Sequence, residues 1–189
     1  VAQPVTTIAV MGAGLMGAGI AQVSAEKGFS VLLKDRDDAS VSRGQTYMNE
    51  NWRKKLSKRH MTQYQFSLNT SNVTPLTDDI ESWRRHFGKA DLVIEAVFED
   101  LDLKRKIVAT MEEVTPENCI FATNTSAIPI GDIAVGANRP DQIVGMHYFS
   151  PVPQMPLLEI IPHAGTSDAT KATAFEVGVK QGKTCIIVK

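Results

Sequence analysis

Three closely spaced glycines, Gly12, Gly14 and Gly17, follow an apolar run near the start of the chain. The run, residues 7–11, is typical of a buried strand, and the apolar residues at 15–25 fit a helix. The first glycine permits a tight turn, the second lets a pyrophosphate approach the backbone, and the third lets the helix pack against the strand. The phosphate would then lie at the helix N-terminus, where unpaired amides favour anions. The pattern predicts a dinucleotide-binding turn; the competing interpretation is a turn that only packs.

Asp35 follows the next predicted strand, residues 30–34. A carboxylate at this position accepts hydrogen bonds from the adenosine ribose and repels the additional phosphate of NADP, so NAD is the expected cofactor. The neighbouring Arg36 is a possible partner for that phosphate, which keeps NADP as the alternative.

His147 and Glu159 lie in two successive predicted strands, residues 143–148 and 157–161, joined by a proline-rich turn. If the strands are neighbours, the imidazole and the carboxylate come within hydrogen-bond reach. A carboxylate bonded to one ring nitrogen fixes the tautomer, stabilises the imidazolium and leaves the other nitrogen as a general base. The alternative is a strand histidine that is hydrogen-bonded for structure alone.

Further polar residues follow the ends of other predicted strands. Asn124 and Ser126 come after the strand at 120–123, and Glu99 and Lys104 come after the strand at 92–96. In an open parallel sheet, ligands bind at the carboxyl edge, where these residues are expected. The alternatives are a polar cap on a turn for the first pair and an exposed ion pair for the second, which would contribute little to stability.

The predicted strands alternate with helical patterns, as in a parallel sheet wrapped by helices. Strands are predicted at residues 7–11, 30–34, 92–96, 120–123, 143–148, 157–161 and 184–188. Helices are predicted at residues 15–25, around Ile80–His86, and at 100–113 and 166–180; Gly28 would end the first, and Thr166 or Ser167 would cap the last. A polar helical excursion is predicted over 38–67, with Tyr47, Trp52 and Leu56 facing inward. Residues 69–79 are predicted as a loop. The expected class is α/β: a Rossmann-like, doubly wound, mostly parallel sheet with a helical excursion.

Composition excludes several other classes of protein. The 189 residues are 43% hydrophobic and carry a net charge of −1, so bulk charge favours neither nucleic acid nor an anionic membrane as a partner. The longest apolar stretch, residues 8–21, is too short to span a bilayer. Cys119 and Cys185 lie far apart in apolar segments, which predicts two buried thiols in a reducing compartment such as the cytoplasm. A chain of this length needs neither a metal nor a disulfide.

Several motifs together resemble one family. They are AVMGAGLMGAGIA at 9–21, VIEAVFED at 93–100, NTS at 124–126, GMHYFSPV at 145–152 and PLLEII at 156–161. The chain resembles, over nearly its whole length, the NAD-binding domain of L-3-hydroxyacyl-CoA dehydrogenases. The segments IPHAGTS, QGKT and KRH, together with Ser150, are most similar to the α subunit of bacterial multifunctional fatty acid oxidation complexes.

The resemblance implies a role for each matching residue. His147 would take the proton from the 3-hydroxyl, Glu159 would orient it, Ser126 would bond the substrate oxygen, and Asn124 would align substrate and nicotinamide. The remaining roles concern NAD: Gly12, Gly14, Leu15, Met16 and Gly17 for the pyrophosphate, Asp35 for the adenosine ribose, and Glu99 and Lys104 for the nicotinamide-side ribose. The implied reaction is NAD-dependent oxidation of L-3-hydroxyacyl-CoA to 3-ketoacyl-CoA in fatty acid β-oxidation.

The resemblance also implies what surrounds the chain. The basic patch at residues 53–59 would meet coenzyme A phosphates, with Lys55 as the preferred contact, although a solvated helix end is the alternative. A thiolase β subunit and self-association are expected for the whole protein. Residues 1–189 start at Val1 and stop before the family's C-terminal helical domain, so the sequence predicts an excised domain that binds NAD but turns over acyl-CoA poorly.

Two other functions stay open at this point. A dinucleotide-binding module without catalysis would share the glycine turn and would not need His147. Dehydrogenases of the 3-hydroxyacid or 6-phosphogluconate type also share a Gly-Leu-Met-Gly turn, but they use a catalytic lysine in a helical segment. The His147 and Glu159 pattern disfavours this second alternative.

Overall fold

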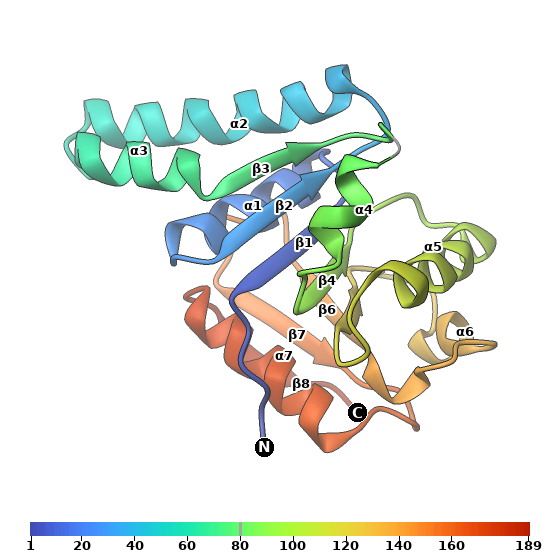
Figure 1. Ribbon diagram of the computed structural model, residues 1–189. Coiled ribbons are helices and arrows are strands. Elements are labelled where there is room, and N and C mark those ends of the chain that lie inside the picture. The colour runs from blue at the N-terminus through green and yellow to red at the C-terminus, as the bar shows by residue number, and fades with distance from the viewer. Residues whose placement is uncertain (80) are drawn as a thin grey trace.

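The computed structural model describes residues 1–79 and 81–189, which form one eight-stranded sheet in the order β3-β2-β1-β4-β5-β6-β7-β8 (Figure 1). Only the β6–β7 pair is antiparallel; the other neighbours run parallel. The strands are β1 (Thr7–Met11), β2 (Ser30–Lys34), β3 (Val73–Leu76), β4 (Leu92–Glu95), β5 (Ile120–Thr123), β6 (Ile143–Tyr148), β7 (Leu157–Ile161) and β8 (Thr184–Ile187). The order reverses between β1 and β4, and this switch point is where open α/β sheets bind ligands.

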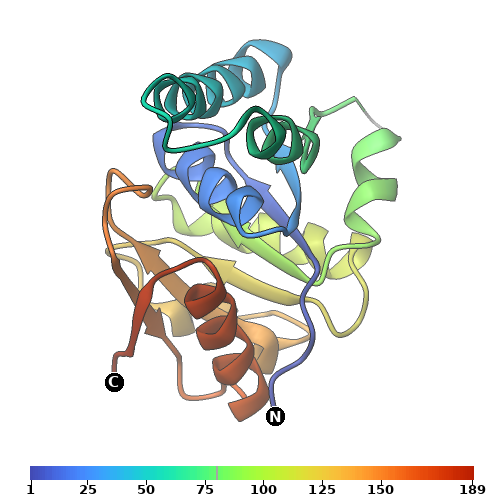
Figure 2. The ribbon, with the colours of Figure 1, turned by 90° about the vertical axis from the view of Figure 1, so that its left-hand side faces the viewer.

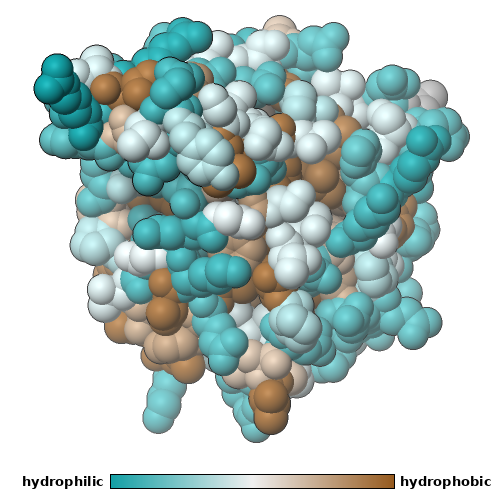
Figure 3. All heavy atoms as spheres, turned by 60° about the vertical axis from the view of Figure 1, so that its left-hand side comes forward, coloured by the Kyte–Doolittle hydropathy of each residue, from teal (hydrophilic) through white to brown (hydrophobic). Residues whose placement is uncertain are grey.

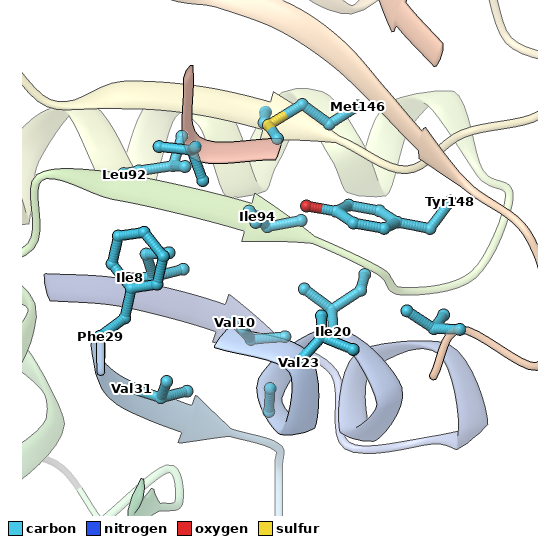
Figure 4. Close-up of a cluster of buried hydrophobic side chains, with 14 of the residues drawn as sticks. Ile8, Val10, Ile20, Val23, Phe29, Val31, Leu92, Ile94, Met146 and Tyr148 are labelled. Carbon is cyan, nitrogen blue, oxygen red and sulfur yellow. The ribbon is translucent and has the colours of Figure 1, made fainter. Parts of the chain in front are cut away.

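Helices cover both faces of this sheet, because successive strand residues point to opposite sides. One core lies between the sheet and α1 (Leu15–Glu26), α2 (Asp38–Ser57) and α7 (Asp168–Lys180), and Figure 4 shows its centre. In Figure 2, α1 and α7 lie in front of the sheet. The second core lies against α4 (Ser82–Phe87), α5 (Leu101–Val114) and α6 (Ile130–Ala134). The predicted doubly wound α/β architecture is therefore confirmed.

The polar helical excursion predicted over residues 38–67 is present. It consists of two helices, α2 and α3 (Gln63–Ser71), and ends four residues later than predicted. A capping box at Thr62 and Gln65 begins the second helix, which explains the break. Trp52 is buried as expected, and Tyr47 and Leu56 are half-buried.

Residues 69–79, predicted as a loop, contain the strand β3. Pro75 has no amide hydrogen, but β3 is the edge of the sheet, where a missing donor is tolerated. The helix expected around Ile80–His86 is present as α4, with Ile80 itself outside the described residues. The short helix α6 and the 3₁₀ turn at Pro140–Gln142 were not predicted.

Other expectations concern single residues. Gly28 ends α1 with φ = +88°, and Ser167 caps α7, both as predicted. Cys119 is buried, but the prediction that Cys185 is buried is wrong: β8 is the other edge of the sheet and leaves this thiol half-buried. None of the helices described is long and apolar enough to cross a membrane. Figure 3 shows hydrophilic and hydrophobic side chains mixed over the face in view.

Candidate active site

The glycine turn joins β1 to α1 at the switch point of the sheet. Gly12 has φ = +102°, which a residue with a side chain rarely adopts, and a Cβ on Gly17 would lie 1.7 Å from the Gly12 carbonyl oxygen. Gly14 begins α1 without a side-chain cap, and a Cβ there would have nothing within 4 Å. The first amides of a helix have no partner within the helix, and no side chain of Gly14 caps them here, which fits a pyrophosphate. Leu15 is exposed and Met16 half-buried beside them.

Asp35 lies at the end of β2, next to this turn. Its carboxylate accepts hydrogen bonds from the backbone amides of Ala13 (2.8 Å) and Arg36 (2.7 Å), so its position is fixed. It lines a cleft of about 280 Å³ together with Gly14, the half-buried ring of Tyr47 and other residues of α1 and α2. The carboxylate keeps lone pairs free for ribose hydroxyls. The Arg36 guanidinium is exposed and lies 3.2 Å from an oxygen of Asp37.

His147 and Glu159 face each other across the antiparallel pair β6–β7, where they are directly opposite in register. The distance from His147 Nδ1 to Glu159 Oε1 is 2.9 Å, and both side chains are about three-quarters buried. The Phe149 ring lies 4.7 Å from the imidazole, centroid to centroid. Nε2 has no hydrogen-bond partner among the described residues. The pair therefore has the geometry of a general base oriented by a carboxylate.

A second cleft, of about 350 Å³, brings several elements together at the carboxyl edge of the sheet. Its lining residues are Met16, Ala96, Val97, Glu99, Asn124, Ser126, His147, Tyr148, Phe149 and Ser150. Ser126 is exposed in it. Asn124 Oδ1 accepts the Tyr148 amide at 2.8 Å, and its NH₂ group, which has no hydrogen-bond partner among the described residues, can donate to a ligand. Residues that are far apart in sequence thus converge on one cleft beside the start of α1.

Lys104 is not among the described residues that line this cleft. Its side chain is 1% exposed, and its ammonium lies 2.5 Å from Glu95 Oε1 and 3.7 Å from Glu99 Oε1. The exposed ion pair considered from the sequence is therefore wrong: Lys104 is buried behind Glu99. Glu95, Thr123 and their hydrogen bonds were missed, although an acidic residue inside the apolar strand β4 was a signal of a buried partner.

Lys55 lies on the last turn of α2 and is not brought to either cleft. Its ammonium is 2.9 Å from Glu26 Oε1, at the end of α1 farthest from the glycine turn. The same carboxylate oxygen accepts from the Trp52 indole at 2.8 Å. The side chain is 41% exposed, so this ion pair lies at the surface of the α1–α2 contact.

Comparisons with known proteins agree with this site. Residues 7–189 match the family model described as 3-hydroxyacyl-CoA dehydrogenase, NAD binding domain. Similar structures include a 3-hydroxybutyryl-CoA dehydrogenase from Escherichia coli K12 (32% identity over 98% of this chain and 38% of that one, TM-score 0.92). Another is the (S)-3-hydroxybutyryl-CoA dehydrogenase PaaH1 from Ralstonia eutropha (34% identity, 98% and 64%, TM-score 0.92).

A third similar structure is the dehydrogenase part of a multifunctional enzyme from C. elegans, with 28% identity over 100% of this chain and 42% of that one and a TM-score of 0.86. This chain spans less than two thirds of each of these three. The family match covers the glycine turn and the His147–Glu159 pair alike. This chain therefore belongs to the 3-hydroxyacyl-CoA dehydrogenase family as an NAD-binding domain, with NAD as its cofactor.

Proposed function

We propose that this chain is the cofactor-binding part of an enzyme that oxidises L-3-hydroxyacyl-CoA to 3-ketoacyl-CoA with NAD, in fatty acid β-oxidation. The observation that carries the proposal is that His147, paired with Glu159, lines the same cleft as Met16 on the first turn of α1. A nucleotide on the glycine turn and a hydroxyl at His147 would share one cleft, as hydride transfer requires. The names of the similar structures support this substrate class.

His147 is proposed to act through Nε2, which takes the proton of the 3-hydroxyl as the C3 hydride leaves. Bound NAD supplies the hydride acceptor. Glu159 holds Nδ1 at 2.9 Å and stabilises the imidazolium that forms. Ser126 is proposed to donate to the substrate oxygen and Asn124 to align substrate and cofactor, since both line the cleft. The half-buried surroundings strengthen these interactions relative to water.

The same proposal extends to the larger protein that contains this domain and to its partners. We place it in a multifunctional enzyme that acts with a thiolase subunit, self-associates and works in the cytoplasm. The match to the dehydrogenase part of a multifunctional enzyme supports the first of these points, as do the segments IPHAGTS, QGKT and KRH. Coenzyme A phosphates are proposed to meet the basic end of α2, where Lys55 would have to leave Glu26 to bind them.

Replacing His147 tests the proposal in the whole protein that carries this domain. We expect His147→Gln to lower kcat for acetoacetyl-CoA reduction by roughly 10²–10⁴-fold, with little change in KM for NADH, because it removes the acid–base group. The matched control is His86→Gln, on α4 and outside both clefts. Undiminished activity of His147→Gln would favour a binding module without catalysis, or a dehydrogenase that uses a different base.

A further inference from the structure

A buried polar network lies behind the cleft that holds His147. Glu95, at the end of β4, is completely buried and accepts three hydrogen bonds. They come from the Lys104 ammonium at 2.5 Å, the Val97 amide at 2.9 Å and the Thr123 hydroxyl at 2.6 Å. Donors therefore reach both carboxylate oxygens, which offsets part of the cost of burying the charge.

The network continues to the residues that line the cleft. Thr125 is buried and donates its hydroxyl to Glu99 Oε2 at 2.6 Å, while Glu99 Oε1 lies 3.7 Å from Lys104. Thr123 and Thr125 alternate along the chain with Asn124 and Ser126, which face the cleft. Thr123 and Thr125 are thus bonded to the network, whereas Asn124 and Ser126 remain available to ligands.

We propose that Glu95 is a positioning residue for the nicotinamide half of the cofactor, acting through Lys104 and Thr123 without touching the cofactor. This inference rests on the proposed function, which puts the nicotinamide in the cleft with His147. Glu95 ties the loop after β4, the first turns of α5 and the end of β5 to one carboxylate. Two walls of the cleft, at Val97–Glu99 and Asn124–Ser126, therefore hold their spacing only while Glu95 is charged.

The charge of Lys104 makes Glu95 necessary. The ammonium is buried and has two carboxylate neighbours, Glu95 in contact and Glu99 at 3.7 Å. With Glu95 present, Glu99 keeps one oxygen on Thr125 and can offer the other to a ribose hydroxyl. Without the charge of Glu95, the ammonium draws Glu99 inward, because a buried cation needs an anionic partner. The cofactor would then lose its hydrogen bond to Glu99, although Glu95 itself does not contact the cofactor.

Binding of two nucleotides to this chain separates this role from general stabilisation. On the proposed function, NADH would occupy both clefts, whereas AMP, which lacks the nicotinamide half, would occupy only the cleft lined by Asp35. We expect Glu95→Gln to raise the Kd of NADH roughly tenfold, about 1.4 kcal/mol, and to leave the Kd of AMP within about twofold. If Glu95 acts through Lys104, the variant Glu95→Gln/Lys104→Met binds NADH no more weakly than Lys104→Met alone.

The matched control is Glu112→Gln on the same helix as Lys104. Glu112 accepts the amides of Asn138 and Arg139 and lies outside both clefts, so the ratio of NADH to AMP affinity should not change. Thr123→Val removes one hydrogen bond from Glu95 and keeps every charge; a smaller shift in the same ratio is expected even if Glu95→Gln fails to fold.

Three results would overturn the inference or its basis. Equal losses of NADH and AMP affinity in Glu95→Gln would reduce Glu95 to a fold-stabilising residue. Unchanged affinity for both would exclude any role. If the unaltered chain binds AMP but not NADH, the proposed place of the nicotinamide fails first, and the inference fails with it.

Discussion

Asp35 is held by two backbone amides, so its carboxylate is in place before a nucleotide binds. Such preorganisation lowers the entropy cost of binding. The negative charge of Asp35 disfavours the additional phosphate of NADP, whereas the exposed Arg36 beside it can pair with that phosphate. The preference between the two cofactors therefore depends mainly on one side chain.

We predict that Asp35→Ser narrows the preference for NADH over NADPH by roughly tenfold or more, because it removes the charge repulsion and leaves Arg36 available. Fluorescence titration of both cofactors measures the ratio of their Kd values. Arg36→Met, with Asp35 intact, should lower only the residual NADPH affinity. An unchanged ratio in Asp35→Ser would mean that another group selects the cofactor.

The residues of the site differ in how well the sequence predicts them. His147 and Glu159 were predictable because two successive strands joined by a proline-rich turn pair in antiparallel register. The Glu95–Lys104 pair was not, because it depends on how α5 packs over the end of β4. Sequence spacing specifies neighbours along a strand or helix, whereas this pair depends on tertiary packing.

At the scale of elements, α1 is held close to the turn between β6 and β7. A Cβ on Gly19 would lie 2.8 Å from the Val152 Cβ, closer than side-chain carbons approach. Lys183, whose pKa is lowered by burial, donates to the Val152 and Met155 carbonyl oxygens at 2.6 and 2.7 Å. The turn that follows His147 is thereby fixed to α1 and to the residue that precedes β8.

We predict opposite effects of alanine at two helical glycines. Gly19→Ala should lower the free energy of unfolding by about 1–3 kcal/mol, because the clash exceeds the gain in helix propensity. Gly131→Ala in α6, where the nearest atom to a Cβ is 3.9 Å away, should raise it by about 0.5–1 kcal/mol. Urea denaturation checks both; stabilisation by Gly19→Ala would show that α1 does not pack tightly on this turn.

The elements that sequence patterns missed share a physical cause. β3 is short, lies at the sheet edge and contains a proline, so neither apolar periodicity nor propensity marked it. The helix α6 has five residues, too few for a period of 3.6 to show. The central strands and long helices were predictable because burial on one or both faces imposes a regular pattern.

At the scale of the whole molecule, two cores enclose the sheet, and Cys119 lies in the second. Burial raises the pKa of its thiol to about 12. In the unfolded chain the thiol ionises near pH 8.5–9. Its contribution to stability is therefore fully present below about pH 9 and is lost as pH rises toward 12, because only the unfolded state releases the proton in that range.

We predict that the free energy of unfolding falls less in Cys119→Ala than in the unaltered chain when the pH is raised from 7.5 to 10. The expected difference between the two losses is about 1.4 kcal/mol. At pH 7.5 the variant is expected to have a lower free energy of unfolding than the unaltered chain, because the substitution leaves a small cavity. Urea denaturation at both pH values measures the difference. Equal losses of free energy of unfolding in the two proteins would show that the thiol ionises equally well in the folded state.

The glycine turn of this domain is expected to bind the dinucleotide at the N-terminus of α1. Titration of the 189-residue chain with NADH, followed by nicotinamide fluorescence, tests it most directly. We predict one saturable site that Gly14→Asp weakens roughly tenfold or more, because a side chain and a negative charge enter the open space before α1. The absence of saturable binding, or equal binding by Gly14→Asp, would exclude the glycine turn as the binding site of the dinucleotide.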